Sequence, residues 1–289
     1  MEKKYVLYNP HACNGRGEEQ AKSLAQRLEG EVVFTDITTV GKYGEFFAGM
    51  SAEDTLIICG GDGTLNRFVN DTRDVSFNNS VYYYPAGSGN DFAHDIGASA
   101  EGDPVCIDEY IKELPTVTVG GEERYFINGV GYGVDGYCCE VGDRLRATSD
   151  KPINYTSIAV KGVLFNYAPT NATVTVDGVT KEYKKVWIAP TMNGRYYGGG
   201  MIPTPDQDRR NPDGELSLMI FSGSGRVKTL MVFPSIFKGE HVKHTDIVEV
   251  LTGKDITVKF DSPRSLQIDG ETVLDVTEYR ATSKKLAKV

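Results

Sequence analysis

The sequence predicts two domains, an N-terminal α/β domain with a parallel sheet and a C-terminal, mostly antiparallel β domain that is sandwich-like. In the first third of the chain, apolar runs alternate with stretches of helical periodicity, whereas after about residue 118 short β-rich runs separated by turns take over. The length of 289 residues suffices for two domains. We place them at residues 1–118 and 119–279. We expect the C-terminal tail, residues 280–289, either to fray or to pack back on the first domain.

The first domain is predicted to contain four strands that alternate with helices. The expected strands are residues 5–8, 32–34, 55–59 and 81–84. A helix is expected after the first strand because apolar residues recur there with helical spacing, namely Ala21, Leu24, Ala25 and Leu28. Glycine-rich loops follow three of the strands, at residues 9–17, 60–64 and 85–91. Because the carboxyl ends of parallel strands meet at one edge of a sheet, we expect the three loops to converge there.

The most informative of these loops is Gly60-Gly61-Asp62-Gly63-Thr64-Leu65-Asn66, which directly follows a buried strand and opens into a helical pattern. Glycine lets the backbone approach a bulky anion closely and adopt positive φ. A helix N-terminus presents N–H groups to negative charge. The pattern therefore predicts a phosphate site, with Asp62 available to a metal ion or an ordered water. A plain βα turn is the alternative.

The second domain is predicted from six β-rich runs and three Asp-Gly pairs. The runs are residues 125–127, 173–176, 186–188, 216–221, 256–258 and 266–268. Asp-Gly pairs at 177–178, 213–214 and 269–270 predict hairpins. Helices are expected near 153–165 and 226–238, the second kinked or ended by Pro234. Its apolar residues are expected to pack in the core or, alternatively, to line a lipid pocket; they are Leu230, Phe233 and Phe237.

Charge, hydropathy and cysteine content argue against several classes of protein and favour a cytoplasmic protein. The net charge of -9 argues against a nucleic-acid binder and against bulk attraction to an anionic membrane, although a local basic patch could still contact one. No apolar run is long enough to span a membrane, and the N-terminus enters a strand without a signal-peptide pattern. Five cysteines without metal spacing favour a reducing compartment; they are Cys13, Cys59, Cys106, Cys138 and Cys139.

Five blocks of sequence together resemble the diacylglycerol kinase catalytic domain family, soluble bacterial lipid kinases that are related to sphingosine kinases. The blocks are Asn9-Pro10 with the glycines that follow, Gly60 to Thr64, Pro85 to Ala93, Asn193-Gly194 with Gly198 to Gly200 and Asp213-Gly214, and Ile268 to Glu271. The resemblance implies a Rossmann-like first domain, as in NAD kinases and phosphofructokinases, and an active site in the cleft between the domains. It implies ATP-dependent phosphorylation of a lipid hydroxyl, most simply that of diacylglycerol or a related lipid, with Mg²⁺.

The resemblance also assigns nucleotide-binding residues by position. They are Asn9, Pro10, Thr38, Gly60, Gly61, Asp62, Gly63, Thr64, Leu65, Asn66, Gly87, Ser88, Asn90 and Asp91. Ser88 stands where the family usually has Thr, and either hydroxyl can donate to a phosphate or a ribose. Asp62 and Asp91 are the candidate carboxylates for Mg²⁺ or its water, since this ion prefers hard oxygen ligands.

Asp269 matches the family's catalytic base, and Glu271 stands beside it. A carboxylate within reach of a lipid hydroxyl can accept its proton during phosphoryl transfer. By itself, Asp269-Gly270 between apolar runs is also the pattern of a type I′ turn. The resemblance further implies a structural Mg²⁺ held by the carbonyls of Arg210 and Glu215 and by the side chain of Asp213; a simple turn is the alternative.

One departure leaves the acceptor open. Family members that act on diacylglycerol often carry an Asp shortly before the second domain, whereas residues 114–119 here contain no carboxylate. An NAD kinase-like or phosphofructokinase-like activity, or a lipid- or nucleotide-binding regulator without catalysis, are therefore retained as alternatives. The expected partners are a lipid substrate and, transiently, a membrane surface, with Lys238, Lys243 and Lys254 as candidate contacts. Homodimer formation is left open.

Overall fold

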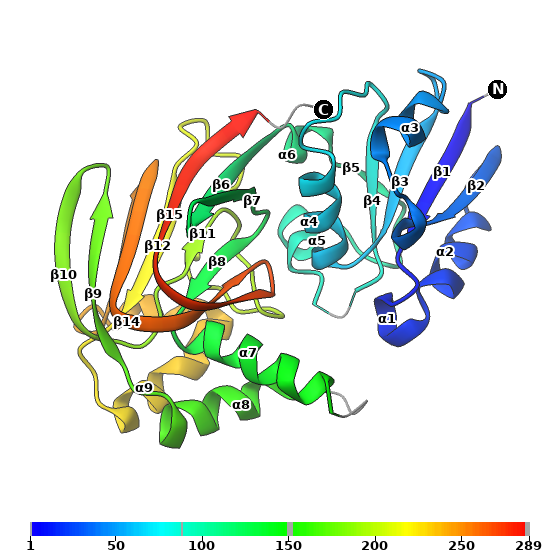
Figure 1. Ribbon diagram of the computed structural model, residues 1–289. Coiled ribbons are helices and arrows are strands. Elements are labelled where there is room, and N and C mark those ends of the chain that lie inside the picture. Colours follow the sequence, from blue (N-terminus) through cyan, green and yellow to red (C-terminus); the bar gives the residue numbers. More distant parts are fainter. Residues whose placement is uncertain (1, 88, 149–152, 287–289) are drawn as a thin grey trace. The chain divides into compact units, whose positions relative to one another are not determined.

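The computed structural model describes residues 2–87, 89–148 and 153–286, and the chain forms two compact units (Figure 1). The first unit comprises Met1–Leu114 with Lys285–Val289, and the second comprises Pro115–Lys284. Among the described residues, no helix is long and apolar enough to cross a membrane.

The first unit is built on a five-stranded sheet with the order β2-β1-β3-β4-β5. Its strands are β1 (Lys3–Tyr8), β2 (Glu31–Asp36), β3 (Thr55–Gly60), β4 (Val81–Pro85) and β5 (Val105–Cys106). β1 to β4 pair in parallel, as predicted, and only β5 runs antiparallel to its neighbour. Asp36, Tyr8, Cys59 and Tyr84 stand in register across the sheet, so the carboxyl ends of β1 to β4 share one edge.

Short helices connect these strands and bury their apolar sides against the sheet. They are α1 (Ala12–Gly15), α2 (Gly17–Ala25), η1 (Ile37–Thr39), α3 (Tyr43–Ala48), α4 (Asp62–Asp71), α5 (Asp91–Ile96) and α6 (Asp108–Ile111). The predicted helical spacing is confirmed in α2, where Ala21 and Leu24 are fully buried. Phe68 of α4 is also fully buried. Phe47 of α3 stacks on Phe77, which follows α4, with the ring centroids 3.8 Å apart.

The second unit is an antiparallel sheet, which confirms the predicted fold class. Its strands are β6 (Glu113–Val119), β7 (Glu122–Tyr125), β8 (Gly129–Tyr132), β9 (Thr170–Val176), β10 (Val179–Val186), β11 (Thr191–Met192), β12 (Leu216–Phe221), β13 (Val248–Gly253), β14 (Asp255–Ile268) and β15 (Glu271–Leu286). The main path is β13-β12-β11-β8-β14-β15-β6-β7, and β9 joins β10 to β14. Tyr132 stacks on Phe260 at 3.9 Å between ring centroids inside its core.

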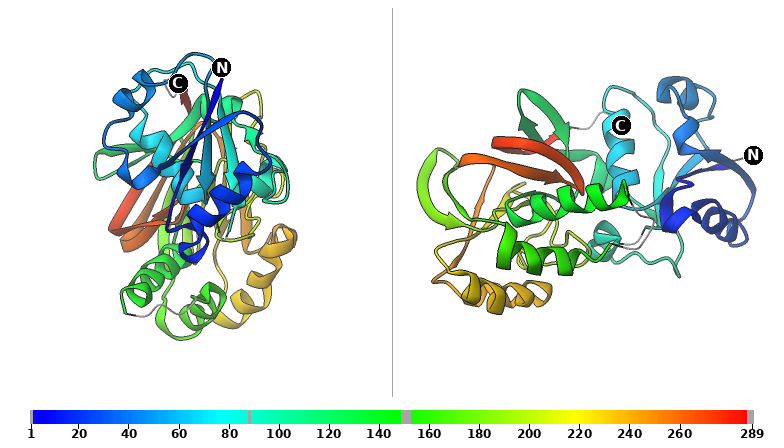
Figure 2. Two further views of the ribbon diagram at one scale, coloured as in Figure 1. Left: turned by 90° about the vertical axis from the view of Figure 1, so that its right-hand side faces the viewer. Right: turned by 60° about the horizontal axis from the view of Figure 1, so that its bottom comes forward.

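Helices cover one side of this sheet (Figure 2). They are α7 (Val134–Arg146), α8 (Tyr155–Lys161), the π-helical turn η2 (Gly162–Asn166), α9 (Arg226–Val232), and the 3-10 turns η3 (Phe233–Lys238) and η4 (Glu240–Lys243). Both predicted helical stretches occur, and the α-helix ends just before Pro234, which cannot continue its hydrogen bonding. Leu230 and Phe233 pack against the core, but Phe237 is exposed, so the prediction of core packing is wrong there.

The structure corrects several details predicted for the second domain. Of the predicted runs 125–127 and 186–188, only Tyr125 and Val186 lie in strands, at the ends of β7 and β10. Asp-Gly pairs 177–178 and 269–270 form hairpin turns with positive φ at both residues, but 213–214 lies in the long connection between β11 and β12. The two runs 256–258 and 266–268 belong to one strand, β14, whose pairing with β15 shifts register along its length. Helix α7 was not predicted, since its first turn contains Gly136 and follows Gly133.

Candidate functional site

The predicted phosphate site is a sharp turn from strand to helix. Gly60 ends β3, Gly61 is the N-cap of α4, and the helix begins at Asp62, so one residue forms the connection. Gly61 provides no side-chain cap, and a Cβ built on Gly63 would meet no atom within 4 Å. The first turn of α4 is therefore open on its outer side. A helix N-terminus with open space before it suits a phosphate group.

Backbone-to-backbone packing joins this turn to the one after β4. A Cβ on Gly87 would lie 2.5 Å from the Cα of Gly61, and a Cβ on Gly60 would lie 2.6 Å from the side chain of Thr64. No side chain fits at these positions. The sequence pattern suggested that these glycines make room for a ligand. In the structure, their missing side chains make room for the neighbouring loop.

Asp62 ties the same two segments together through hydrogen bonds. Its Oδ2 accepts the N–H of Asp91 and its Oδ1 accepts the N–H of Phe92, both at 2.9 Å. Asp62 therefore caps α5. Asn90, the N-cap residue itself, has φ 53° and makes no side-chain cap bond; its amide group instead exchanges two bonds of 2.9 Å with the backbone of Gly87.

The first glycine-rich segment reaches the same place through Asn9. Its Nδ2 donates to Oγ1 of Thr64 at 2.9 Å, and its backbone N–H donates to the carbonyl of Cys59 at 3.1 Å. The three segments therefore converge at the carboxyl edge of the sheet, as predicted. Pro10 follows Asn9 directly, and Thr38 lies in η1 after β2, where its N–H and hydroxyl both donate to Asp36.

The remaining predicted nucleotide contacts differ in exposure. Leu65 is fully buried, and the side chains of Thr64, Asn66 and Asp91 are also buried. Leu65 therefore anchors α4 in the core. Ser88 lies outside the described residues.

In the second unit, Asp269 occupies the first position of the turn between β14 and β15, with φ 47°, and Gly270 follows with φ 91°. Its Oδ2 accepts the N–H of Ile127 at 2.5 Å, and its Oδ1 accepts the N–H groups of Asn128 and Gly129 at 2.8 and 3.0 Å. Three backbone donors, two just before β8 and one at its first residue, thus fix this carboxylate. Neither the turn pattern nor the family motif indicates these donors.

Glu271, predicted beside Asp269, starts β15 and forms an ion pair with Arg124 of β7 at 3.0 Å. The Glu271 side chain is 53% exposed, so we attribute little stability to this pair.

A buried arginine supports the segment that holds Asp269. Arg209 donates from Nη1 to the carbonyl of Ile127 at 3.3 Å and from Nη2 to Oδ1 of Asn128 at 3.0 Å. Asn193 donates to the same Ile127 carbonyl at 2.9 Å. No sequence pattern singles out Arg209, because an arginine in a polar loop is usually solvated.

The loop predicted to hold a structural Mg²⁺ is closed by its own amide groups. The carbonyl of Glu215 accepts from Nδ2 of Asn211 at 2.9 Å and from Nε2 of Gln207 at 3.0 Å, which uses both of its lone pairs. Asn211 also donates to the carbonyl of Asp208 and accepts from the N–H of Glu215. Asp213 is exposed. In this conformation the Glu215 carbonyl therefore has no lone pair left for an ion.

Asp135 is a further carboxyl group that the sequence did not point to. It lies in the first turn of α7 and is buried, and Tyr197 donates to its Oδ2 at 3.2 Å. Its Oδ1 has no hydrogen-bond partner among the described residues. Burial disfavours the charged form and raises the pKa of Asp135 to about 6. Among the described residues, no three His, Cys, Asp or Glu side chains cluster closely enough to hold a metal ion.

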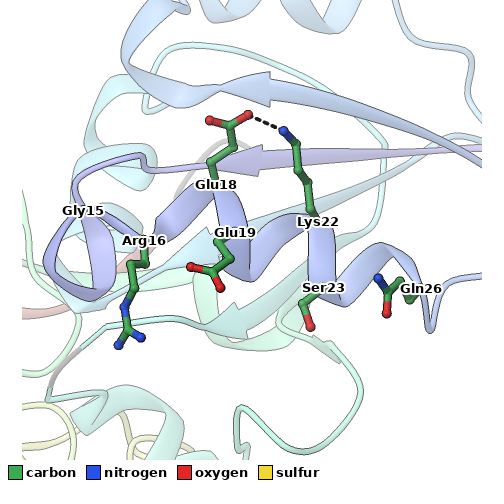
Figure 3. Close-up of a pocket in the computed structure, with 7 residues that line it drawn as sticks. All are labelled: Gly15, Arg16, Glu18, Glu19, Lys22, Ser23 and Gln26. Carbon is green, nitrogen blue, oxygen red and sulfur yellow. Dashed lines mark ion pairs between the residues drawn. The ribbon is translucent and has the colours of Figure 1, made fainter.

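A separate hollow of about 570 Å³ lies along α2 (Figure 3). Charged side chains line it, including the ion pair between Glu18 and Lys22 at 2.7 Å. Its lining includes Gly15 and Arg16 of the first glycine-rich segment but no residue of the segments 60–66 or 85–91.

Comparison with known proteins gives two family matches along the chain. Residues 3–119 match the diacylglycerol kinase catalytic domain, and residues 128–282 match the YegS C-terminal NAD kinase beta sandwich-like domain. A diacylglycerol kinase of Mycobacterium tuberculosis is 27% identical over 217 residues, which is 73% of this chain and 67% of that protein. YtlR of Bacillus subtilis, named as a candidate lipid kinase, is 23% identical over 319 aligned positions, covering 96% of both chains.

Among solved structures, a candidate diacylglycerol kinase from Bacillus anthracis superposes with a TM-score of 0.68. The match covers 99% of this chain and 93% of that one, at 19% sequence identity. At this identity the likeness concerns the fold.

Proposed function

Because the chain belongs to the diacylglycerol kinase catalytic domain family, we propose that it transfers the γ-phosphoryl group of ATP to the hydroxyl of a lipid, diacylglycerol or a related molecule. The observation that carries the proposal is the joined pair of glycine turns at the carboxyl edge of the parallel sheet. Gly61 and Gly87 touch through their backbones, and the N-terminus of α4 opens beside them. Phosphoryl transfer depends mainly on positioning and on electrostatic stabilisation, which fixed backbone donors supply.

Asp269 is the proposed proton acceptor. The hydroxyl oxygen of the lipid forms the new bond to phosphorus, the bond to the leaving ADP oxygen breaks, and the hydroxyl proton passes to the carboxylate. The backbone donors of residues 127–129 hold that carboxylate in one orientation, which favours a positioned base. Arg209 and Asn193 support those donors from the other side.

Magnesium, when bound with ATP, would neutralise phosphate charge. Asp62 and Asp91 belong to the joined segments and carry the hard oxygen ligands that suit this ion. Asp62 also caps α5, so its substitution would disturb both roles.

The test is product identification with γ-labelled ATP, Mg²⁺ and either diacylglycerol, sphingosine, fructose 6-phosphate or NAD as the acceptor. We compare wild type with Asp269→Asn, and use Asp177→Asn as the matched control. Asp177 occupies the same position in the other Asp-Gly hairpin, also with φ 47°, and its carboxylate accepts the N–H groups of Lys254 and Asp255, each at 2.9 Å.

We expect a phosphorylated lipid, a loss of about 10²- to 10⁴-fold in kcat for Asp269→Asn, and near wild-type turnover for Asp177→Asn. If only NAD or fructose 6-phosphate is phosphorylated, the acceptor is a small molecule and the lipid proposal is wrong. ATP binding without any product would favour a regulator. Full turnover in Asp269→Asn would remove that residue as the base.

A further inference from the structure

Half of the exposed large apolar side chains of the described residues lie on two helical segments of the second unit. These segments, residues 153–167 and 225–239, make up about a tenth of the 289 residues. The side chains are Val160 (39% exposed), Phe165 (75%), Val227 (72%), Met231 (71%) and Phe237 (41%). Single exposed apolar residues are ordinary, but a group of this size indicates an interaction site.

The two segments are fastened side by side. η2 of the first segment contacts α9 of the second. Arg226, at the start of α9, donates to the carbonyls of Val163 and Tyr167 at the end of the other segment. Figures 1 and 2 show α8 and α9 next to each other in each view. We call this pair of segments the helical face.

Their inward sides are already used for folding. Ile158, Val163, Val232 and Ile236 are buried in the core of the second unit. Val227 and Met231 are four positions apart and therefore share the opposite side of α9. The exposed apolar residues are thus additional to those that the fold requires.

The charge of the helical face is opposite to that of the whole chain. The two segments contain no Asp or Glu and four basic residues, Lys161, Arg226, Lys228 and Lys238, whereas the chain carries a net charge of -9. Lys228 pairs with Asp246, which lies outside the segments. Lys161 and Lys238 are exposed, whereas Lys243, one of the three predicted contacts, pairs with Glu240 at 3.1 Å.

We propose that the helical face docks the protein on an anionic lipid surface. Phe165, Val227 and Met231 would enter the boundary between head groups and acyl chains, and the lysines would contact the anionic head groups. A second copy of this chain fits less well, because a two-fold contact would place the same basic residues against each other. The inference rests on the proposed function to the extent that a lipid kinase must reach its acceptor at a membrane.

Flotation of the full-length protein with vesicles tests the proposal without ATP, diacylglycerol or turnover. One set of vesicles contains equal amounts of phosphatidylglycerol and phosphatidylcholine, and the other contains phosphatidylcholine alone. The test variant is Phe165→Ser with Met231→Ser. The matched control is Val179→Ser with Leu274→Ser, which changes two exposed apolar residues outside the helical face (74% and 58% exposed). A second variant, Lys161→Glu with Lys238→Glu, changes charge alone.

We expect wild type and the control to float with anionic vesicles, and both test variants to bind roughly tenfold more weakly. Salt should release the wild type. Equal binding by wild type and Phe165→Ser/Met231→Ser would overturn the proposal. So would sedimentation showing a wild-type dimer that this variant converts to a monomer without any vesicle binding, since a second copy would then cover the face. If the protein binds vesicles but phosphorylates no lipid, the proposed kinase activity is wrong and the proposed docking face is still supported.

Discussion

Replacing Asp135 with asparagine should change how stability depends on pH. Desolvation raises the pKa of this carboxyl from 3.8 to about 6 in the folded protein. Between these two values the folded state binds more protons than the unfolded state. The free energy of unfolding of wild type therefore falls as pH rises through this window and levels off above it. An asparagine side chain cannot titrate, so the Asp135→Asn variant lacks this loss.

The size of the effect follows from the shift of about two pH units. At about 1.4 kcal/mol per unit, the variant should gain about 3 kcal/mol relative to wild type between pH 3 and pH 7. For a unit of this size, that is roughly 6–12 °C in the difference between the two Tm values. At any single pH the difference also includes the cost of an unpaired amide group, so the change with pH is the quantity to compare.

Thermal or urea unfolding of both proteins at several pH values gives this comparison. A second variant, Tyr197→Phe, removes the hydroxyl that donates to Oδ2 of Asp135 and that lowers the pKa of this carboxyl. It should raise that pKa further and extend the pH-dependent window upward. A stability difference between Asp135→Asn and wild type that stays constant from acid to neutral pH would refute the assignment of a raised pKa to Asp135.

Three further predictions concern the loops. Gly87→Ala places a Cβ 2.5 Å from the Cα of Gly61 and should weaken ATP binding at least roughly tenfold in calorimetry, while the fluorescence of Trp187 in the second unit stays unchanged. Wild-type affinity would show that the turns tolerate separation. Asp62→Ala removes the acceptor of two N–H groups of α5 and should lower the free energy of unfolding by about 1–2 kcal/mol in urea titrations; no change would reject the capping role. Asn211→Ala removes the amide group that closes the loop and should lower the free energy of unfolding by about 1–2 kcal/mol. Adding Mg²⁺ without nucleotide should leave the wild-type Tm unchanged. An increase in Tm would show that the loop binds an ion.

The parallel sheet could be predicted because strand and helix patterns alternate in the first third of the chain. Convergence of the three glycine-rich segments also followed from topology alone, since parallel strands end at one edge. Helix α7 could not be found in this way. Gly133 and Gly136 interrupt its beginning, and glycine disfavours helices in isolation. Tertiary packing requires these glycines, because a Cβ on Gly136 would lie 1.9 Å from the carbonyl oxygen of Ser265.

The glycines of the phosphate segment show a second limit of sequence patterns. A glycine indicates that another group comes close to the backbone, but it does not indicate which group this is. At Gly61 and Gly87 the approaching group is the other glycine's backbone, whereas at Gly63 the space is open. Asp62 has the same ambiguity, since a carboxylate at a turn can bind an ion or cap a helix, and here it caps α5. Only long-range contacts separate these meanings.

Two Asp-Gly hairpins in one sheet make the same point for the proposed base. Asp177 and Asp269 have the same φ and the same following residue, so local sequence and turn geometry cannot distinguish them. They differ in the backbone that each carboxylate meets. Asp177 bonds to the start of β14, the strand next to its own hairpin, whereas Asp269 bonds to residues 127–129, which Arg209 and Asn193 hold from the other side. If that support positions a base, Arg209→Met should lower kcat more than it raises the KM for the lipid, and Arg209→Lys should restore part of the loss. If both variants lose the same free energy of unfolding and the same fraction of active protein, with no selective loss in kcat, Arg209 serves folding alone.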